Sequence, residues 1–88
     1  MKRNDGFFLR NIGGQDLLVP LGARVVDLNG VIVFNATGLY IWELLAQDRS
    51  LDDLAAAVGE RFEVEPERAR IDIRAFVAEI AKWGGVET

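Results

Sequence analysis

Three helix-start signals in the second half of this 88-residue chain constrain most strongly what it can fold into. Asn35 and Ser50 are of the residue types that cap helix N-termini, and Asp53 completes a variant of the capping box with Ser50. Pro66, flanked by glutamates, is favoured at the first position of a third helix, and Gly84-Gly85 ends that helix. The three predicted helices cover residues 36–47, 50–62 and 66–83.

The first third of the chain has strand and turn patterns instead. Two apolar runs, residues 7–12 and 15–19, flank Gly13-Gly14, which predicts a β-hairpin. Residues 31–34 are β-branched and aromatic and predict a third strand. We therefore expect an α+β domain, with a three-stranded antiparallel sheet followed by a three-helix cluster in a winged helix-turn-helix-like arrangement. Trp42 is expected to be the large anchor of the core between the sheet and the helices.

The residue types that are missing exclude many kinds of chemistry. The chain contains no cysteine and no histidine. This excludes thiolate catalysis, Ser-His-Asp triads and zinc sites built on these side chains. The acidic residues start helices or lie on solvated faces, so no metal site is expected, and no phosphate-binding loop motif suggests a cofactor. We expect a protein that is not an enzyme.

The charge balance bears on the class of partner. The chain has 10 basic and 14 acidic side chains and a net charge of −4, which is unfavourable for nucleic-acid binding. Basic and acidic side chains are also balanced in the third predicted helix, where a groove-reading helix is normally basic. A winged-helix DNA-binding module is kept as an alternative. No apolar run reaches the roughly 20 residues of a membrane span and the N-terminus is polar, so we expect a soluble cytoplasmic protein.

The third predicted helix has apolar residues on two sides, at 100° per residue. The broad side is the natural core face and comprises Ala69, Ile73, Phe76, Val77, Ile80 and Trp83. The narrow side comprises Ile71, Ala75 and Ala78. Two interpretations are open. Either this side is an ordinary exposed face with Ile71 as a scattered surface hydrophobe, or it is a shallow groove for another chain. The charged residues flanking that groove would be Arg68, Asp72, Arg74, Glu79 and Lys82.

The third predicted strand offers a second surface for another chain. A small sheet has exposed edges, and the unpaired N–H and C=O groups of an edge are a template for a further strand. If residues 31–34 form an edge beside the third helix, an extended peptide can pair with them by β-augmentation. A tail of the chain or a second copy, forming a homodimer, would cover the same edge equally well.

Several segments together resemble one protein family. A strand, an Asn-Ala-Thr-Gly turn and an apolar-Trp-Glu-Leu-Leu helix occupy residues 31–45. A Ser-capped helix start at 49–55, an aromatic-Glu-Val link at 62–64 and a long helix through 71–80 follow. This pattern resembles the PqqD family of pyrroloquinoline quinone (PQQ) biosynthesis proteins, also known as RiPP recognition elements. The resemblance extends over nearly the whole chain from Phe7, and residues 21–30 match the family pattern least well.

The resemblance implies a single PqqD-like domain over residues 1–88 that binds peptides without catalysing a reaction. Members of the family bind the leader of a ribosomally made precursor peptide and present it to a modifying enzyme, often a radical S-adenosylmethionine (SAM) enzyme. The leader adds as a strand to the third strand and packs against the third helix. The strand contacts carried over to this chain are Val31, Ile32, Val33 and Phe34. The helix contacts are Ile71, Ala75 and Ala78, with Arg68, Asp72 and Arg74 at the rim.

Overall fold

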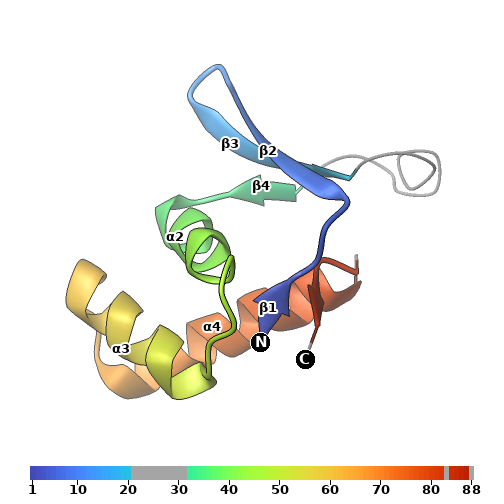
Figure 1. Cartoon of the computed structure of the whole chain (residues 1–88). Coiled ribbons are helices and arrows are strands. Elements are labelled where there is room, and N and C mark those ends of the chain that lie inside the picture. Colours follow the sequence, from blue (N-terminus) through green and yellow to red (C-terminus); the bar gives the residue numbers. More distant parts are fainter. Residues whose placement is uncertain (21–31, 83, 88) are drawn as a thin grey trace.

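Among the described residues, a three-stranded antiparallel sheet lies on one side and the helices lie on the other (Figure 1). The computed structural model describes residues 1–20, 32–82 and 84–87. The strands are β1 (Lys2–Arg3), β2 (Phe7–Ile12), β3 (Gln15–Pro20), β4 (Ile32–Phe34) and β5 (Val86–Glu87). The helices are α2 (Ala36–Leu44), α3 (Leu51–Phe62) and α4 (Pro66–Lys82). The expected α+β class and the order of sheet and helices are confirmed, and the winged-helix likeness stays a prediction.

The predicted hairpin forms around its two glycines. Gly13 and Gly14 have φ angles of 61° and 84°, a region that side chains disfavour and that two-residue hairpin turns require. The turn sets the register of β2 against β3, with Ile12 opposite Gln15 and Phe7 opposite Pro20. The central strand β3 therefore pairs with β2 along its whole length.

β4 completes the sheet on the other side of β3, with Leu18 opposite Ile32 and Asp16 opposite Phe34. Side chains alternate between the two faces of each strand, and Leu18 and Phe34 face the helices, where both are buried. The Trp42 ring of α2 lies 6.0 Å from the Phe34 ring and 6.3 Å from the Phe7 ring, measured between centroids. Trp42 is only 4% exposed, so its predicted role as a core anchor is confirmed.

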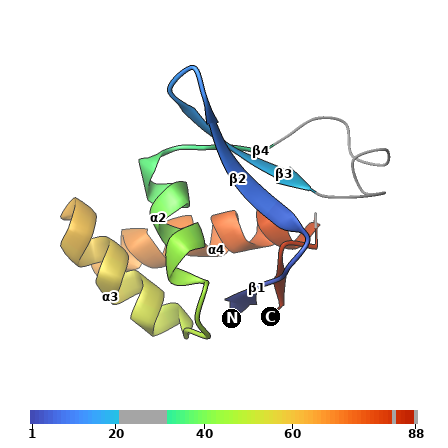
Figure 2. The same ribbon diagram turned by 45° about the horizontal axis from the view of Figure 1, so that its top comes forward.

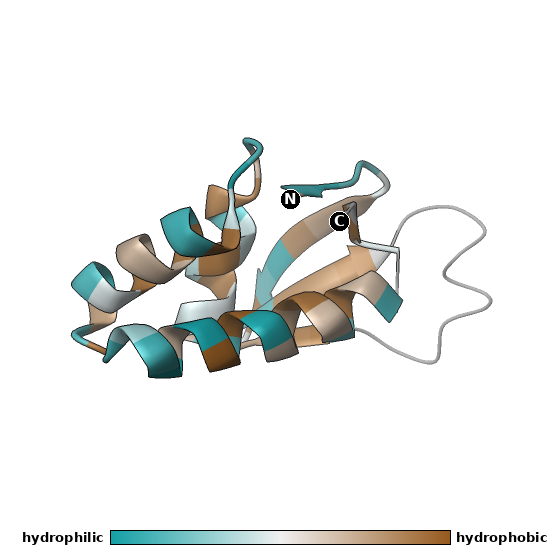
Figure 3. Cartoon of the chain, turned by 90° about the horizontal axis from the view of Figure 1, so that it is seen from below, coloured by the Kyte–Doolittle hydropathy of each residue, from teal (hydrophilic) through white to brown (hydrophobic). Residues whose placement is uncertain are grey.

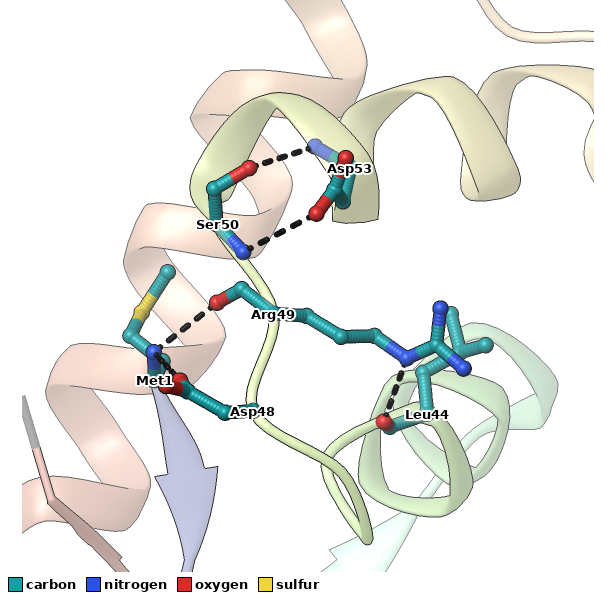
Figure 4. Close-up of polar contacts among 6 residues, drawn as sticks. All are labelled: Met1, Leu44, Asp48, Arg49, Ser50 and Asp53. Atoms are coloured by element: carbon teal, nitrogen blue, oxygen red, sulfur yellow. Dashed lines mark hydrogen bonds and ion pairs between the residues drawn. The ribbon is translucent and has the colours of Figure 1, made fainter.

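Local caps fix where the helices begin. The Asn35 side chain accepts a hydrogen bond of 2.7 Å from the Gly38 amide at the start of α2. Ser50 and Asp53 form the reciprocal capping box of α3. α2 ends at Leu44, three residues before the predicted end at residue 47. The guanidinium of Arg49 donates a 2.7 Å hydrogen bond to the Leu44 carbonyl there, which satisfies a group that the helix end leaves free (Figure 4).

The core face of α4 agrees with the helical periodicity. Ala69, Ile73, Val77 and Ile80 are all buried, and Phe76 is half-buried. Trp83, which the periodicity predicts on the same face, lies outside the described residues. Figure 3 views the molecule from the side of α4 and shows hydrophobic bands among hydrophilic ones on that helix, as expected where some apolar residues remain outside the core.

The two ends of the chain form a second sheet that the sequence pattern does not indicate. β1 pairs antiparallel with β5, with Arg3 opposite Val86. The Arg3 amide donates to the Leu45 carbonyl, and the Arg3 guanidinium lies 5.4 Å from the centroid of the Trp42 ring. These contacts attach the N-terminal strand to the end of α2.

The connection between α2 and α3 holds the N-terminal amino group (Figure 4). The Met1 ammonium group donates 2.7 Å and 2.8 Å hydrogen bonds to the Asp48 carboxylate and the Arg49 carbonyl. The hydrogen bond and the positive charge hold the pKa of Asp48 below its ordinary value. Within residues 1–20, 32–82 and 84–87, no helix combines the length and apolarity that crossing a membrane requires.

Candidate functional site

β4 forms one edge of the three-stranded sheet. The strand order is β2-β3-β4, so β3 occupies one side of β4 and no described strand pairs with its other side. Figures 1 and 2 show β4 leading directly into α2, with α4 passing beneath. Within the described part of the chain, the backbone donors and acceptors on this side of β4 are therefore free to pair with an added strand.

A groove runs between β4 and α4, beside this edge. It consists of two adjoining depressions of about 550 Å³ and about 320 Å³, which we call together the β4–α4 groove. Both depressions are lined by Asn35, Gly38, Ala75 and Phe76. The larger one is also lined by Ile32, Val33, Phe34, Glu79 and Ile80. The smaller one is also lined by Thr37, Ile41, Arg68 and Asp72.

The close approach of α2 and α4 forms the floor of the groove. A Cβ atom built on Gly38 would lie 3.1 Å from the Phe76 ring and 3.2 Å from the Asn35 side chain. Glycine at this position therefore lets the first turn of α2 approach the Phe76 ring. Phe76 in turn lies 5.4 Å from the Phe34 ring between centroids. The floor of the groove is thus aromatic and rests on the core.

Charged side chains lie near both ends of the groove and leave its middle apolar. Arg68 and Asp72 form an ion pair of 3.2 Å between Nε and Oδ1, one turn apart on α4. Towards the other end of α4, Glu79 pairs with Lys82 at 3.5 Å. Ala75 lies between the two pairs, and its small side chain leaves the groove open there. This arrangement suits an extended segment with apolar side chains in its middle and polar groups at its ends.

The sequence-predicted site residues fall into four groups. Six of them line the groove: Ile32, Val33, Phe34, Arg68, Asp72 and Ala75. Arg74 and Ala78 line a different depression, of about 270 Å³, on the side of α4 that faces Met1 and Leu51. Ile71 is 59% exposed and lines neither. Val31 lies outside the described residues.

Helix geometry explains why the predicted contacts on α4 do not all line the same depression. The residues of α4 that line the groove are centred about 90° from Ile71 in one direction, at about 100° per residue. Arg74 and Ala78 are turned the other way from Ile71. The predicted apolar stripe therefore lies on a ridge of α4, and the groove is beside it.

Several groove residues were not predicted as contacts. Asn35, Gly38 and Phe76 line both depressions, and Ile80 lines the larger one together with Glu79, which was expected only as a charged residue flanking the groove. The signals were present, because Asn35 and Gly38 lie where the third strand meets the helix that follows it. The helical periodicity predicts Phe76 on the core face, and its half-buried ring packs against the core and also lines the groove.

The described residues do not bring together any three carboxylates that could hold a metal ion. In this part of the chain the groove offers apolar surface, backbone groups and ion pairs. These are means of binding an extended chain by shape, hydrogen bonding and charge.

The described residues thus form a small α+β domain in which the β4 edge of the sheet and helix α4 border a groove. The solved structure titled "TbiB1 in Complex with the TbiA(beta) Leader Peptide" has the same fold, with a TM-score of 0.71 and 22% sequence identity. The match covers 93% of this chain and 90% of that one. The family described as "Coenzyme PQQ synthesis protein D (PqqD)" matches residues 22–84. The chain belongs to the PqqD family, which confirms the resemblance seen in the sequence. No curated protein matches the chain.

Proposed function

We propose that this chain is a RiPP recognition element that binds the leader of a ribosomally made precursor peptide. The leader adds to the free edge of β4 as a further strand, and its side chains enter the β4–α4 groove. The chain presents the leader to a modifying enzyme and does not itself catalyse a reaction. Membership of the PqqD family supports this function, as does the shared fold with TbiB1, whose solved structure contains a leader peptide.

The observation that carries the proposal is the position of the groove directly beside the free edge of β4. Strand addition supplies main-chain hydrogen bonds, and pockets for alternate side chains supply specificity. Ile32 and Phe34, on the helix-facing side of β4, both line the groove. A strand added to β4 would direct every second side chain toward the same helix-facing side. There these side chains would contact Ala75 and Phe76, which line the groove.

The residue types in and around the groove support binding without catalysis. The chain has no cysteine or histidine, and Arg68 and Glu79 at the groove ends are each in an ion pair. An exposed ion pair at a groove end is suited to selecting the charge of a ligand. The modifying enzyme supplies the chemistry, and the family resemblance favours a radical SAM enzyme in that role.

An amide-resolved NMR titration of the labelled chain tests the function. The ligands are the N-terminal segments of short peptides encoded beside its gene, with duplex DNA as the control. We expect shifts concentrated on residues 32–38 of β4 and α2 and on residues 68–80 of α4. The absence of shifts with every leader, together with salt-sensitive shifts on DNA, would replace this function by the winged-helix alternative.

A further inference from the structure

The sheet has a second apolar surface on the face turned away from the helices. Phe8 lies opposite Val19, and Leu17 lies between Arg10 and Val33. Directly opposite residues share a face, so these five side chains lie together. Ile12, two residues beyond Arg10, lies on the same face. We call this surface the outer sheet face: Phe8, Arg10, Ile12, Leu17, Val19 and Val33.

The outer sheet face is accessible in the described part of the molecule. Figures 1 and 2 show all three described helices on the other side of the sheet. Ile12 and Val33 are each 57% exposed, and Phe8 is 36% exposed. Leu17 and Val19, at the centre, are half-buried by their neighbours. Exposed apolar patches of this contiguous kind mark interaction surfaces more often than scattered single residues do.

One charged side chain lies on this face, and it indicates the kind of partner. The Arg10 guanidinium lies 5.7 Å from the centroid of the Phe8 ring and has no carboxylate partner among the described residues. The other described residues of the face are uncharged. A partner that covers the face must therefore supply a carboxylate to Arg10, or the guanidinium would be buried without compensation.

This requirement argues against a second copy of the chain as the occupant. A two-fold symmetric pair would place the same patch on both sides of the interface. Each copy would then bring Arg10 and no carboxylate from the outer sheet face. The surface fits a different protein, one with apolar side chains and an acidic residue at matching positions.

The outer sheet face continues into the proposed leader site. Val33 borders the groove at the edge of β4, but the strand register places its side chain on the outer sheet face, while its neighbours Ile32 and Phe34 point toward the helices. A leader strand added to β4 would place alternate side chains beside Val33 on the outer sheet face. One protein lying on this face would then contact both the recognition domain and the outward side chains of the leader.

We propose that the outer sheet face is the docking surface for the modifying enzyme, which contacts the sheet and the leader strand together. The inference rests on the proposed function and deepens it by naming the surface and the chemistry of the partner. That partner presents an apolar patch with a carboxylate opposite Arg10. Leader binding enlarges the surface, so the enzyme binds the leader-bound domain more tightly than the free domain.

The test uses two charge reversals that are matched in environment. Arg10 is stacked on Phe8, and Arg61 on α3 is stacked in the same way on Tyr40, with a guanidinium-to-centroid distance of 5.4 Å. Both arginines are exposed. Arg10→Glu and Arg61→Glu therefore make the same charge change and lose the same kind of contact, but only Arg10 lies on the outer sheet face. Ile12→Asp is a second variant on that face.

The measurement is the dissociation constant of the peptide-modifying enzyme encoded beside this chain, with and without the leader used in the titration. We expect Arg10→Glu and Ile12→Asp to weaken enzyme binding at least about tenfold and Arg61→Glu to change it less than about twofold. The leader is expected to tighten enzyme binding to the wild-type chain at least about fivefold.

The other outcomes overturn the inference. Equal losses in Arg10→Glu and Arg61→Glu would show a general charge effect, and unchanged binding in Arg10→Glu and Ile12→Asp would show that the enzyme docks elsewhere. A leader without effect on enzyme affinity would refute the shared surface. A dimeric wild-type chain that becomes monomeric in Arg10→Glu, by light scattering, would make a second copy the occupant.

A separate leader titration shows whether a negative result refutes only the docking surface or the proposed function as well. All three variants should bind the leader as the wild type does, since Arg10, Ile12 and Arg61 are remote from the free edge of β4. Leader binding with unaltered enzyme affinity in Arg10→Glu refutes only the docking surface. Absence of leader binding in the wild type refutes the proposed function.

Discussion

Placing a carboxylate in the middle of the β4–α4 groove should abolish most of its affinity for a leader peptide. Ala75 lines both depressions and is exposed in the free chain, so Ala75→Glu adds a charge without filling the core. The free domain should fold normally, because repulsion from Asp72 and Glu79 on the same helix amounts to only about 0.2–0.5 kcal/mol per pair.

The size of the affinity loss depends on what surrounds the carboxylate at position 75 once a leader covers it. The cations near the two ends of the groove on α4, Arg68 and Lys82, each begin seven residues away, about 10 Å along the helix axis, and are already paired with Asp72 and Glu79. The new carboxylate would therefore be desolvated without a partner, which costs about 2–3 kcal/mol. At about 1.4 kcal/mol per factor of ten, the dissociation constant should rise about 30- to 150-fold.

Fluorescence anisotropy with a labelled leader peptide measures this change, and two controls isolate its cause. Ala75→Gln has nearly the same shape without the charge, so its loss of affinity reports only the steric part. Ala78→Glu adds the same charge three residues further along α4, beside the other depression, and should bind the leader nearly as the wild type does. If Ala78→Glu loses affinity while Ala75→Glu keeps it, the leader lies on the Met1 side of α4 and the assignment of the groove is refuted.

Three further predictions concern the scaffold. Ser50→Ala removes the side-chain oxygen that accepts from the Asp53 amide and should cost about 1 kcal/mol of unfolding free energy, measured by urea denaturation; an unchanged midpoint would show that the capping box contributes nothing. The Leu18 side chain is fully buried beneath the central strand, so Leu18→Ala leaves a cavity there. The free energy of unfolding should fall by about 2–5 kcal/mol in the same assay. A fall of less than about 1 kcal/mol would mean that the core is not packed as described. The pKa of Asp48 is lowered in the folded chain by its contact with the Met1 ammonium group. This contact therefore stabilises the fold fully above the ordinary carboxyl pKa of about 4. The stabilisation is lost as the pH falls through the lower pKa of the folded chain. Asp48→Asn should flatten the acid side of the stability–pH curve, and an identical curve would contradict the pairing.

The parts of the fold that could be predicted from the sequence are those specified by neighbouring residues. The glycine pair of the hairpin, the Asn35 cap and the Ser50 capping box each act within four residues, so their structural outcome is local. At the end of α2 the Arg49 side chain donates back to the Leu44 carbonyl, a contact that the pattern of the helix itself does not indicate. β1 and β5 have two residues each, too few to show a periodicity, and they pair across the whole length of the chain.

The candidate site was only partly predictable for a related reason. Periodicity indicates which side of α4 is buried, but the rotation of α4 relative to β4 depends on packing against α2. The close approach at Gly38 brings Phe76 under β4 and turns the groove toward Ala75, away from Arg74 and Ala78. The free edge of β4 could be anticipated because a three-stranded sheet must have two edges.

The pairing of β1 with β5 also determines how the domain would respond to mechanical tension between its two ends. Lys2 lies opposite Glu87 and Arg3 opposite Val86, so the outward ends of the two strands are adjacent. A pulling force on them acts along the hydrogen bonds of an antiparallel pair, which run perpendicular to the strands, and breaks them one after another. The β1–β5 pair would therefore peel apart at low force. The β2–β3 hairpin lies outside that pair and would carry the load only after the two ends have separated.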